Sequence, residues 1–376
     1  MKIVVAIDSF KGSLTSLQAG SAVKEAIHRL DSKAKVLVKP LADGGEGTVD
    51  ALAEGPDSEI IKLQVSGPLL NTVEAKYCIL KETNTAVIEM AEASGITLIP
   101  LEKRNPLETT TYGVGELIKD AINRGCRRFI VGIGGSATND GGVGMLAALG
   151  YKFLDKEDTP IALGAKGLKD LCKIEVNGVM PELSECSFNI ACDVTNPLCG
   201  ENGCSAVYGP QKGATPEMIK NMDNWLKNFA KISKTLLNNT NENCAGAGAA
   251  GGLGFAFLTF TNAILKSGID IVLEEINLEE DIKDADIVVT GEGRLDSQTV
   301  MGKAPIGVAN LAKKYSKKVL AFSGCVTSDA EVCNEHGIDA FFPITRGITT
   351  LEEALNTNNA YKNLTATAYQ VFRLLI

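Results

Sequence analysis

The sequence predicts an α/β protein of two domains, in which a domain built on a five-stranded parallel sheet is interrupted by a second, inserted α/β domain. The first observation is length, because 376 residues exceed what one hydrophobic core usually supports. The second is that strand-like runs alternate with helical patterns at both ends of the chain. The third is that short runs bounded by turn residues occupy part of the middle.

Both ends of the chain show the alternation of a parallel sheet. Lys2–Asp8 and Lys35–Lys39 read as strands, and Thr15–Leu30 between them has apolar residues at helical spacing. Further strand-like runs lie at Asp286–Thr290, Lys318–Phe322 and Ala340–Ile344, with helical segments near 304–315 and 328–336. Two N-terminal and three C-terminal strands together predict the five-stranded parallel sheet of a flavodoxin-like, doubly wound domain.

The middle of the chain has a different pattern. Short runs separated by turn residues, at Ile60–Val65, Thr72–Leu80 and Ala86–Glu89, predict antiparallel hairpins. Helix and strand patterns follow at Gly115–Asn123, Phe129–Ile133, Ser187–Cys192 and Pro216–Asn238. We therefore expect an inserted mixed α/β domain at 61–279 and a discontinuous flavodoxin-like domain at 1–60 plus 280–376.

Composition and charge exclude several classes of protein. A formal net charge of −9 argues against a nucleic-acid or anionic membrane surface. The sequence has no run of about 18 apolar residues, and the apolar run at its N-terminus is too short for a signal peptide. Ten cysteines without a Cys-x-x-Cys pair, and two histidines, fit free thiols in a reducing compartment better than a zinc site. We expect a cytoplasmic protein with no nucleic-acid or membrane partner, and a homo-oligomer is compatible with the composition.

Six stretches place small residues, most of them glycines, beside acids or lysines. They are 8–12, 42–48, 134–142, 192–198, 291–296 and 302–305. Asp8, Gly134, Asp193 and Gly291 each follow directly on a predicted strand, and Asp43 follows another by a few residues. In open α/β sheets, ligands bind beyond the carboxyl ends of the strands. Glycines let backbone N–H groups approach a phosphate, and carboxylates suit Mg²⁺, so these stretches predict phosphoryl transfer.

Other readings of the glycine-rich stretches stay open. The chain contains no Gly-x-x-x-x-Gly-Lys sequence, and Gly246–Gly251 matches the dinucleotide fingerprint without a strand before it. Gly132–Ala137 does follow a strand-like run and precedes Asp155 by about 20 residues, which leaves an NAD-linked hydroxy-acid oxidoreductase as an alternative. A non-catalytic, two-lobed small-molecule-binding protein is a second alternative, although such proteins normally carry an export signal.

Taken in order, the glycine-rich stretches resemble the glycerate kinase family of bacterial type. The matching stretches are Asp8–Leu14, Ala42–Thr48, Ile88–Ala91, Ala93–Gly95, Gly113–Ile118, Gly132–Gly142, Cys192–Leu198, Gly209–Ala214, Gly246–Gly252, Gly291–Asp296 and Gly302–Pro305. The resemblance implies a flavodoxin-like domain interrupted by a second α/β domain, with the active site in the interdomain cleft. It also implies that the γ-phosphate of ATP is transferred to a small-molecule substrate, D-glycerate, with 2-phosphoglycerate as the product.

Phosphoryl transfer needs cations around the phosphate and a base for the attacking hydroxyl. Because His28 and His336 fall in helical patterns, we expect a carboxylate as the base, with Asp193 the first candidate. The expected catalytic cations are Lys11, Lys212 and Lys303, and the expected Mg²⁺ ligands are Glu292 and Asp296. The expected substrate- and nucleotide-binding residues are Asp8, Ser9, Asp43, Gly44, Gly45, Gly134, Gly135, Ser136, Asn139, Asp140, Asn196, Gln211 and Arg294. Since Lys212 and Lys303 stand in glycine-rich loops, we expect their truncation to remove little packing.

Overall fold

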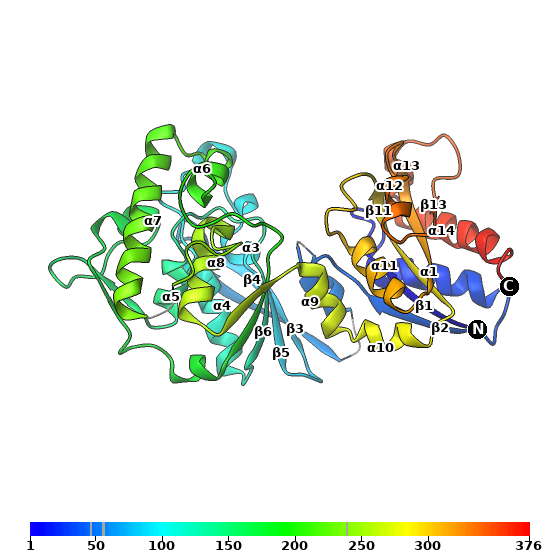
Figure 1. Cartoon of the computed structure of the whole chain (residues 1–376), viewed down its shortest axis with the longest axis horizontal. Helices are drawn as coiled ribbons and strands as arrows, with labels where there is room; N and C mark the ends of the chain where they lie inside the picture. Colours follow the sequence, from blue (N-terminus) through cyan, green and yellow to red (C-terminus); the bar gives the residue numbers. More distant parts are fainter. Residues whose placement is uncertain (46, 55–56, 238–239) are drawn as a thin grey trace. The chain divides into compact units, whose positions relative to one another are not determined.

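The computed structural model describes residues 1–45, 47–54, 57–237 and 240–376 (Figure 1). The chain divides into two compact units, which we call the discontinuous unit (Met1–Pro56 and Ile269–Ile376) and the inserted unit (Asp57–Gly268). These boundaries differ from the expected 60/61 and 279/280. Strand β3 already begins at Ser58, and helix α9 (Gly268–Glu275) packs through Ile269 against Gly307 of the discontinuous unit.

The described residues of the discontinuous unit form a sheet of five strands. They are β1 (Lys2–Ile7), β2 (Lys35–Pro40), β11 (Ile287–Leu295), β12 (Lys318–Val326) and β13 (Ala340–Pro343). Their order is β13-β12-β11-β1-β2, and every neighbouring pair is parallel. This is the strand order of a flavodoxin-like domain, so the predicted five-stranded parallel sheet is confirmed.

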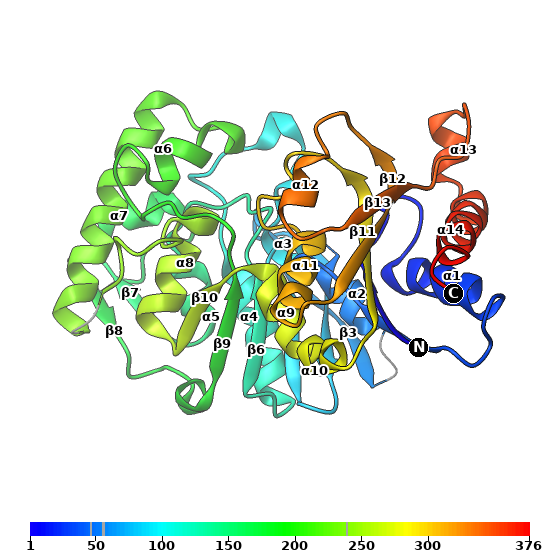
Figure 2. The same cartoon turned by 45° about the vertical axis from the view of Figure 1, so that its right-hand side comes forward.

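Helices cover both faces of this sheet (Figure 2). On one face, α1 (Ser16–His28) and α14 (Thr357–Phe372) pack over Ile3, Val5 and Ile7 of β1. On the other face, α11 (Ala304–Lys314) contacts β1, β11 and β12, with α10 (Leu278–Lys283) beside it. The shorter helices are α2 (Thr48–Ala53), α12 (Val332–Glu335) and α13 (Leu351–Leu355).

Helix α12 is shorter than the expected segment at 328–336. The residues before it form successive turns, in which Ala330 N–H donates to the carbonyl of Thr327 and Cys333 N–H to that of Ala330. Turn hydrogen bonds of this kind replace the first helical turn, so only one turn of helix remains.

The inserted unit has a mixed sheet with the strand order β10-β9-β6-β5-β4-β3 in its described residues. The strands are β3 (Ser58–Ser66), β4 (Thr72–Leu80), β5 (Thr85–Glu89), β6 (Arg128–Gly132), β9 (Ser187–Ala191) and β10 (Ala263–Lys266). β3, β4 and β5 pair antiparallel, as the turn residues predicted, whereas β5, β6, β9 and β10 pair parallel. Strands β7 (Lys152–Leu154) and β8 (Lys173–Glu175) form a separate antiparallel pair.

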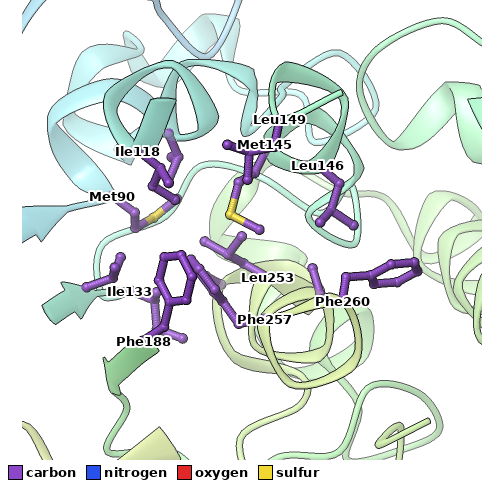
Figure 3. Packing of buried hydrophobic residues seen from close by; sticks show 14 of the residues in the cluster. Met90, Ile118, Ile133, Met145, Leu146, Leu149, Phe188, Leu253, Phe257 and Phe260 are labelled. Atoms are coloured by element: carbon purple, nitrogen blue, oxygen red, sulfur yellow. The ribbon is translucent and has the colours of Figure 1, made fainter. Parts of the chain in front are cut away.

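The core of the inserted unit lies between this sheet and its helices. Figure 3 shows Ile118 of α4 (Tyr112–Asn123), Met145 of α5 (Val143–Ala148) and Phe257 of α8 (Ala249–Phe260) around Phe188 of β9. The rings of Phe188 and Phe129 stack with their centroids 4.7 Å apart. Each fully buried apolar side chain of this size contributes about 1.5–3 kcal/mol.

The remaining helices of the inserted unit lie in its connecting segments. They are α3 (Ala91–Ser94), α6 (Cys204–Tyr208) and α7 (Pro216–Leu236), together with short 3₁₀ helices at Ile96–Leu98, Leu101–Lys103, Ala165–Asp170, Pro181–Glu185 and Pro210–Lys212. The expected end of α7, Asn238, lies outside the described residues. Among the residues that are described, no helix is both long and apolar enough to cross a membrane.

Candidate active site

In the discontinuous unit, three acids gather at the carboxyl ends of neighbouring parallel strands. Asp8 follows β1, Asp43 lies shortly after β2, and Glu292 lies near the end of β11. Burial, and then repulsion by Asp43 and Glu292, raise the pKa of Asp8 to about 7. The backbone N–H of Ser9 donates to Asp8 Oδ1 (2.6 Å), and the charge of Lys11 acts in the opposite direction on this pKa. The predicted residues of the first stretch therefore lie in one electrostatic cluster.

The loop after β2 is shaped by the side chain of Asp43. Its Oδ1 accepts a hydrogen bond from Gly45 N–H (2.9 Å), and Gly44 has a φ of 84°, which a residue with a side chain rarely adopts. The hydroxyl of Thr48 donates to the carbonyl of Gly45 (2.8 Å). Glu46, which belongs to the same stretch, lies outside the described residues.

The strand expected at Asp286–Thr290 extends further than predicted, because β11 continues to Leu295. The strand is extended because β12 runs beside it as far as Val326, which pairs with Leu295. Gly291 is required for this close pairing, since a Cβ atom there would lie 1.9 Å from the carbonyl oxygen of Phe322. Glu292 is thus held by a strand and not by a loop.

Two largely buried carboxylates at the end of β11 face a lysine at the start of α11. Lys303 Nζ lies 3.6 Å from Glu292 Oε2 and 3.8 Å from Asp296 Oδ1. The hydroxyl of Thr299 donates to Glu292 Oε1 (2.8 Å), and burial raises the pKa of Glu292. Arg294 is exposed, and its Nε lies 3.2 Å from Asp296 Oδ2. The expected metal ligands are therefore already ion-paired to cations.

The acids of the discontinuous unit fit a magnesium ion that is also held by phosphate oxygens and water. Among the described residues, no group of three or more His, Cys, Asp or Glu side chains is arranged to hold a metal. In kinase sites, however, Mg²⁺ is usually held by one or two carboxylates together with phosphate oxygens and water. Asp8, which is buried and repelled by Asp43 and Glu292, is a carboxylate that a cation would stabilise.

In the inserted unit, Lys212 is buried, with 3% of its surface exposed, so the expectation of a loosely packed loop lysine is wrong. The turn from Gly209 to Gly213 folds the side chain inward, where Nζ donates to Ser136 Oγ (2.7 Å) and to the carbonyl of Thr138 (2.6 Å). Burial lowers the pKa of Lys212 to about 8. Its amine therefore ties the loop after β6 to the segment after α6.

Asp140 is an internal anchor of the same loop. The carboxylate is fully buried, and it accepts hydrogen bonds from the backbone and hydroxyl of Thr111 (2.8 and 2.9 Å) and from Gly142 N–H (3.1 Å). Burial raises its pKa although these donors oppose the shift. Both carboxylate oxygens are engaged, which favours positioning of the loop over contact with a ligand.

Next to it, Asn139 donates from Nδ2 to Ser205 Oγ (2.8 Å). Its Oδ1 and the hydroxyl of Thr138 are buried, and neither has a hydrogen-bond partner within the described ranges. Gly134 and Gly135 are exposed at the end of β6. Here the loop combines exposed backbone with unused polar atoms, as expected for a ligand-binding turn.

Asp193 is exposed beyond the end of β9, and its Oδ1 accepts a hydrogen bond from Gly268 N–H (3.1 Å). Because β9 lies beside β6 and parallel to it, Asp193 and Gly134 belong to the same edge of the sheet. Asn196 is engaged within the unit, since its amide donates to Asn202 O (2.8 Å) and accepts from the hydroxyl of Tyr208 (2.6 Å).

Each unit therefore brings together one set of the predicted residues. The discontinuous unit holds Asp8, Ser9, Lys11, Asp43, Gly44, Gly45, Glu292, Arg294, Asp296 and Lys303, and the inserted unit holds Gly134, Gly135, Ser136, Asn139, Asp140, Asp193, Asn196, Gln211 and Lys212. Gln211 is exposed beside the buried Lys212. The sequence analysis missed two threonines whose hydroxyls donate hydrogen bonds to site acids, Thr299 to Glu292 and Thr111 to Asp140. The Asp-x-x-Thr spacing of Asp296 and Thr299 is a turn signal that could have identified Thr299.

The geometry does not fit a dinucleotide at Gly132–Ala137. In the dinucleotide fold the glycines open a helix directly, whereas α5 begins only at Val143. Asp155 closes a local turn, because its Oδ1 accepts hydrogen bonds from the N–H groups of Glu157 (2.8 Å) and Thr159 (3.0 Å). In the other dinucleotide-like stretch, Gly246–Gly251, close packing explains a glycine, because a Cβ atom on Gly251 would lie 2.1 Å from Thr138 O.

The sequence model of the glycerate kinase family matches residues 3–376. The chain belongs to the glycerate kinase family. A glycerate kinase from Haemophilus influenzae is 49% identical over 375 residues, which cover 100% of this chain and 99% of that protein. A glycerate 2-kinase from Escherichia coli is 48% identical over 364 residues, covering 97% and 95%.

A crystal structure described as that of a glycerate kinase 2 from Salmonella typhimurium LT2 is similar along the whole chain. The TM-score is 0.92 at 47% identity, with 100% of this chain and 98% of that chain covered. The resemblance to the glycerate kinase family is thereby confirmed, and the chain is a kinase, which implies the use of ATP and a small-molecule substrate.

Proposed function

We propose that this member of the glycerate kinase family transfers the γ-phosphoryl group of Mg·ATP to a hydroxyl of D-glycerate and releases 2-phosphoglycerate. The observation that carries the proposal is the match to the glycerate kinase family along residues 3–376. The names of the relatives, glycerate kinase and glycerate 2-kinase, support the substrate and the product. An enzyme that consumes ATP and a small metabolite also supports the expected cytoplasmic location.

The acids of the discontinuous unit support a role for Mg²⁺. Asp43 and Glu292 both repel the carboxylate of Asp8 in the protein alone, and a divalent cation held by one or two of these acids reduces that repulsion. Bound there with ATP, Mg²⁺ would neutralise phosphate charge. We propose Lys11 and Lys303 as the phosphate-facing cations, because both lie at this cluster. Asp296, which is ion-paired to Arg294 and Lys303, is then a supporting residue or a second ligand.

In the inserted unit, Asp193 is the proposed base for the glycerate hydroxyl. It is an exposed carboxylate at a strand end, and the hydrogen bond from Gly268 N–H fixes one of its oxygens. A carboxylate at this position can accept the proton of a substrate hydroxyl. Lys212 is buried and its amine is hydrogen-bonded to Ser136 and Thr138, so it is not placed to contact a ligand directly. We assign it to positioning the loop that carries the exposed Gly134 and Gly135.

A coupled assay of ADP release tests the proposal. D-Glycerate, L-glycerate, glycolate and lactate are compared as acceptors, with Mg²⁺ and with EDTA, and the product is identified by phosphorus NMR. We expect turnover with D-glycerate, loss of turnover in EDTA, and a phosphate ester at carbon 2. Turnover that persists in chelator would remove the metal role, and absence of ADP release with every acceptor would remove the kinase proposal.

A further inference from the structure

The discontinuous unit contains a pocket of about 300 Å³, and Lys11 is the one lining residue to which the proposed phosphoryl chemistry gives a role. Its walls are largely apolar, with Phe10 and Ile344 on one side and residues of α13 and α14, including Leu355 and Ala360, on the other. A pocket of this size is at the lower end of the range for small-molecule sites, about 300–1,000 Å³. It is large for a three-carbon acid and suits a single nucleoside.

Ser13 gives the pocket an unused polar group. The residue lines the pocket, and its hydroxyl is buried without a hydrogen-bond partner among the described residues. Buried polar atoms are nearly always paired in folded proteins, so an unpaired hydroxyl beside a pocket points to a partner supplied by a ligand.

The pocket and the acid cluster share Lys11. Lys11 lines the pocket and also lowers the pKa of Asp8 through its charge. Gly293, which lines the pocket as well, follows Glu292 in strand β11, where successive side chains point to opposite faces of the sheet. A ligand in the pocket therefore has one end beside Lys11, the cation that the proposed function assigns to phosphate.

We propose that this pocket binds the adenosine part of ATP, an inference that rests on the proposed kinase function and extends it. A flat aromatic base gains from apolar walls, whereas the carboxylate and hydroxyls of a hydroxy acid would lose hydration there. The Ser13 hydroxyl supplies a hydrogen bond to the base or the ribose. The triphosphate then extends past Lys11 toward Asp8 and Glu292.

The test fills the pocket from one face of α13. Ala354 lines the pocket, whereas Glu352 is exposed on the same helix and does not line it, so Ala354→Trp and Glu352→Trp form a matched pair. We expect Ala354→Trp to raise the KM for ATP at least about tenfold, while kcat at saturating ATP and the KM for glycerate change less than about twofold. Glu352→Trp should leave all three constants unchanged.

Ser13→Ala is the second variant, and its signature separates a ligand contact from a structural role. Removing an unpaired buried hydroxyl should raise the Tm of the ligand-free protein, while the affinity for ADP, measured by calorimetry, falls about two- to tenfold. A fall in Tm with unchanged ADP affinity would make Ser13 structural and contradict the inference.

Calorimetry with ADP keeps the inference separate from the proposed function. If the wild type phosphorylates glycerate but Ala354→Trp and Ser13→Ala both bind ADP as it does, the pocket proposal fails and the kinase proposal stands. If both variants weaken the binding of ADP but the wild type phosphorylates none of the acceptors, the kinase proposal fails and the pocket proposal stands. A raised KM for glycerate with normal ADP binding would assign the pocket to the acid and overturn the inference.

Discussion

Asp8 is a residue whose environment works against the stability of the ligand-free protein. Its pKa is about 7 in the folded chain and 3.8 as the ordinary value, so the folded state binds this proton more tightly. Its contribution to stability is therefore complete below about pH 4 and is lost as the pH rises through 7. Asp8→Asn should raise the Tm of the metal-free protein at pH 8, by the equivalent of about 1–4 kcal/mol.

The measurement is thermal unfolding of wild type and Asp8→Asn at pH 8 and pH 4, without metal or nucleotide. The two proteins should differ at pH 8 and converge at pH 4, and Mg·ATP should stabilise only the wild type. A variant that is less stable than the wild type at pH 8 would contradict the assignment of this pKa to burial and repulsion.

We expect Lys212 to stabilise the fold and Lys303 to act mainly in the reaction. Lys212→Ala removes two buried hydrogen bonds and leaves the carbonyl of Thr138 unpaired, so we expect a loss of about 2–4 kcal/mol together with a loss of activity. The ion pairs of Lys303 are longer, at 3.6 and 3.8 Å, and its side chain is one-third exposed, so Lys303→Ala should change stability by less than about 1 kcal/mol.

Urea unfolding and kcat/KM, measured on both lysine variants, test this division. Lys303→Ala should lose activity at nearly unchanged stability, because a phosphate-facing charge acts mainly on the transition state. Equal losses of stability in the two variants would mean that the burial of Lys212 has little energetic weight.

Asp193→Asn tests the proposed base with little structural change. The amide oxygen can still accept the hydrogen bond from Gly268 N–H, so folding should be retained. General-base catalysis typically contributes about 10²–10⁴-fold, and kcat should fall within that range while the KM for glycerate changes much less. Kinetics at saturating Mg·ATP check this. A normal kcat with a strongly raised KM for glycerate would move Asp193 to a binding role.

At the scale of elements, the start of α8 is locked against the loop after β6. Gly251 has a φ of 67°, and a Cβ atom on it would lie 2.1 Å from Thr138 O and 2.6 Å from Asn139 Cα. Gly251→Ala should therefore destabilise the protein by more than about 2 kcal/mol. Gly134→Ala is the matched control, because nothing lies within 4 Å of the position of its Cβ atom.

Thermal unfolding and turnover distinguish the two glycine variants. Gly251→Ala should lower the Tm, whereas Gly134→Ala should keep the Tm and lose activity if the exposed turn contacts a ligand. A Gly134→Ala protein with both Tm and activity intact would remove this turn from the site.

The same elements show what the sequence can and cannot predict. The strands of both sheets are readable because β-branched runs and turn residues mark them locally, as in β1 and in the hairpin of β3 and β4. The extension of β11 was missed because it depends on pairing with β12, which lies more than 20 residues away in sequence. The burial of Lys212 was missed for the same kind of reason, since its partner Ser136 comes from another loop.

At the scale of the whole molecule, the division of the chain follows from strands that meet across an insertion. β1 pairs with both β2 and β11, so the sheet of the discontinuous unit exists only when the N-terminal and C-terminal segments come together. Counting strands predicted this closure, and the candidate site could be predicted as far as the strand ends that carry it. The hydrogen-bond donor or lysine that pairs with each acid could not be predicted from the sequence, because those contacts depend on side-chain packing.

The dependence of activity on pH should report on one titrating group from each unit. Asp8 in the discontinuous unit has a pKa of about 7 and must be ionised to hold a cation, so kcat/KM should rise as the pH rises through 7. Lys212 in the inserted unit has a pKa of about 8, and loss of its proton weakens its hold on the loop after β6, so kcat/KM should fall above about pH 8. The expected profile is a bell with a narrow maximum between these values.

Asp43→Asn identifies the acid limb of this bell. Removing the negative charge of Asp43 removes one of the causes that raise the pKa of Asp8, so the acid limb should move to lower pH while the alkaline limb stays in place. Higher Mg²⁺ concentration should move the same limb in the same direction, because the cation competes with the proton for the carboxylate. An acid limb that moves with neither the substitution nor the metal would mean that a group other than Asp8 controls it.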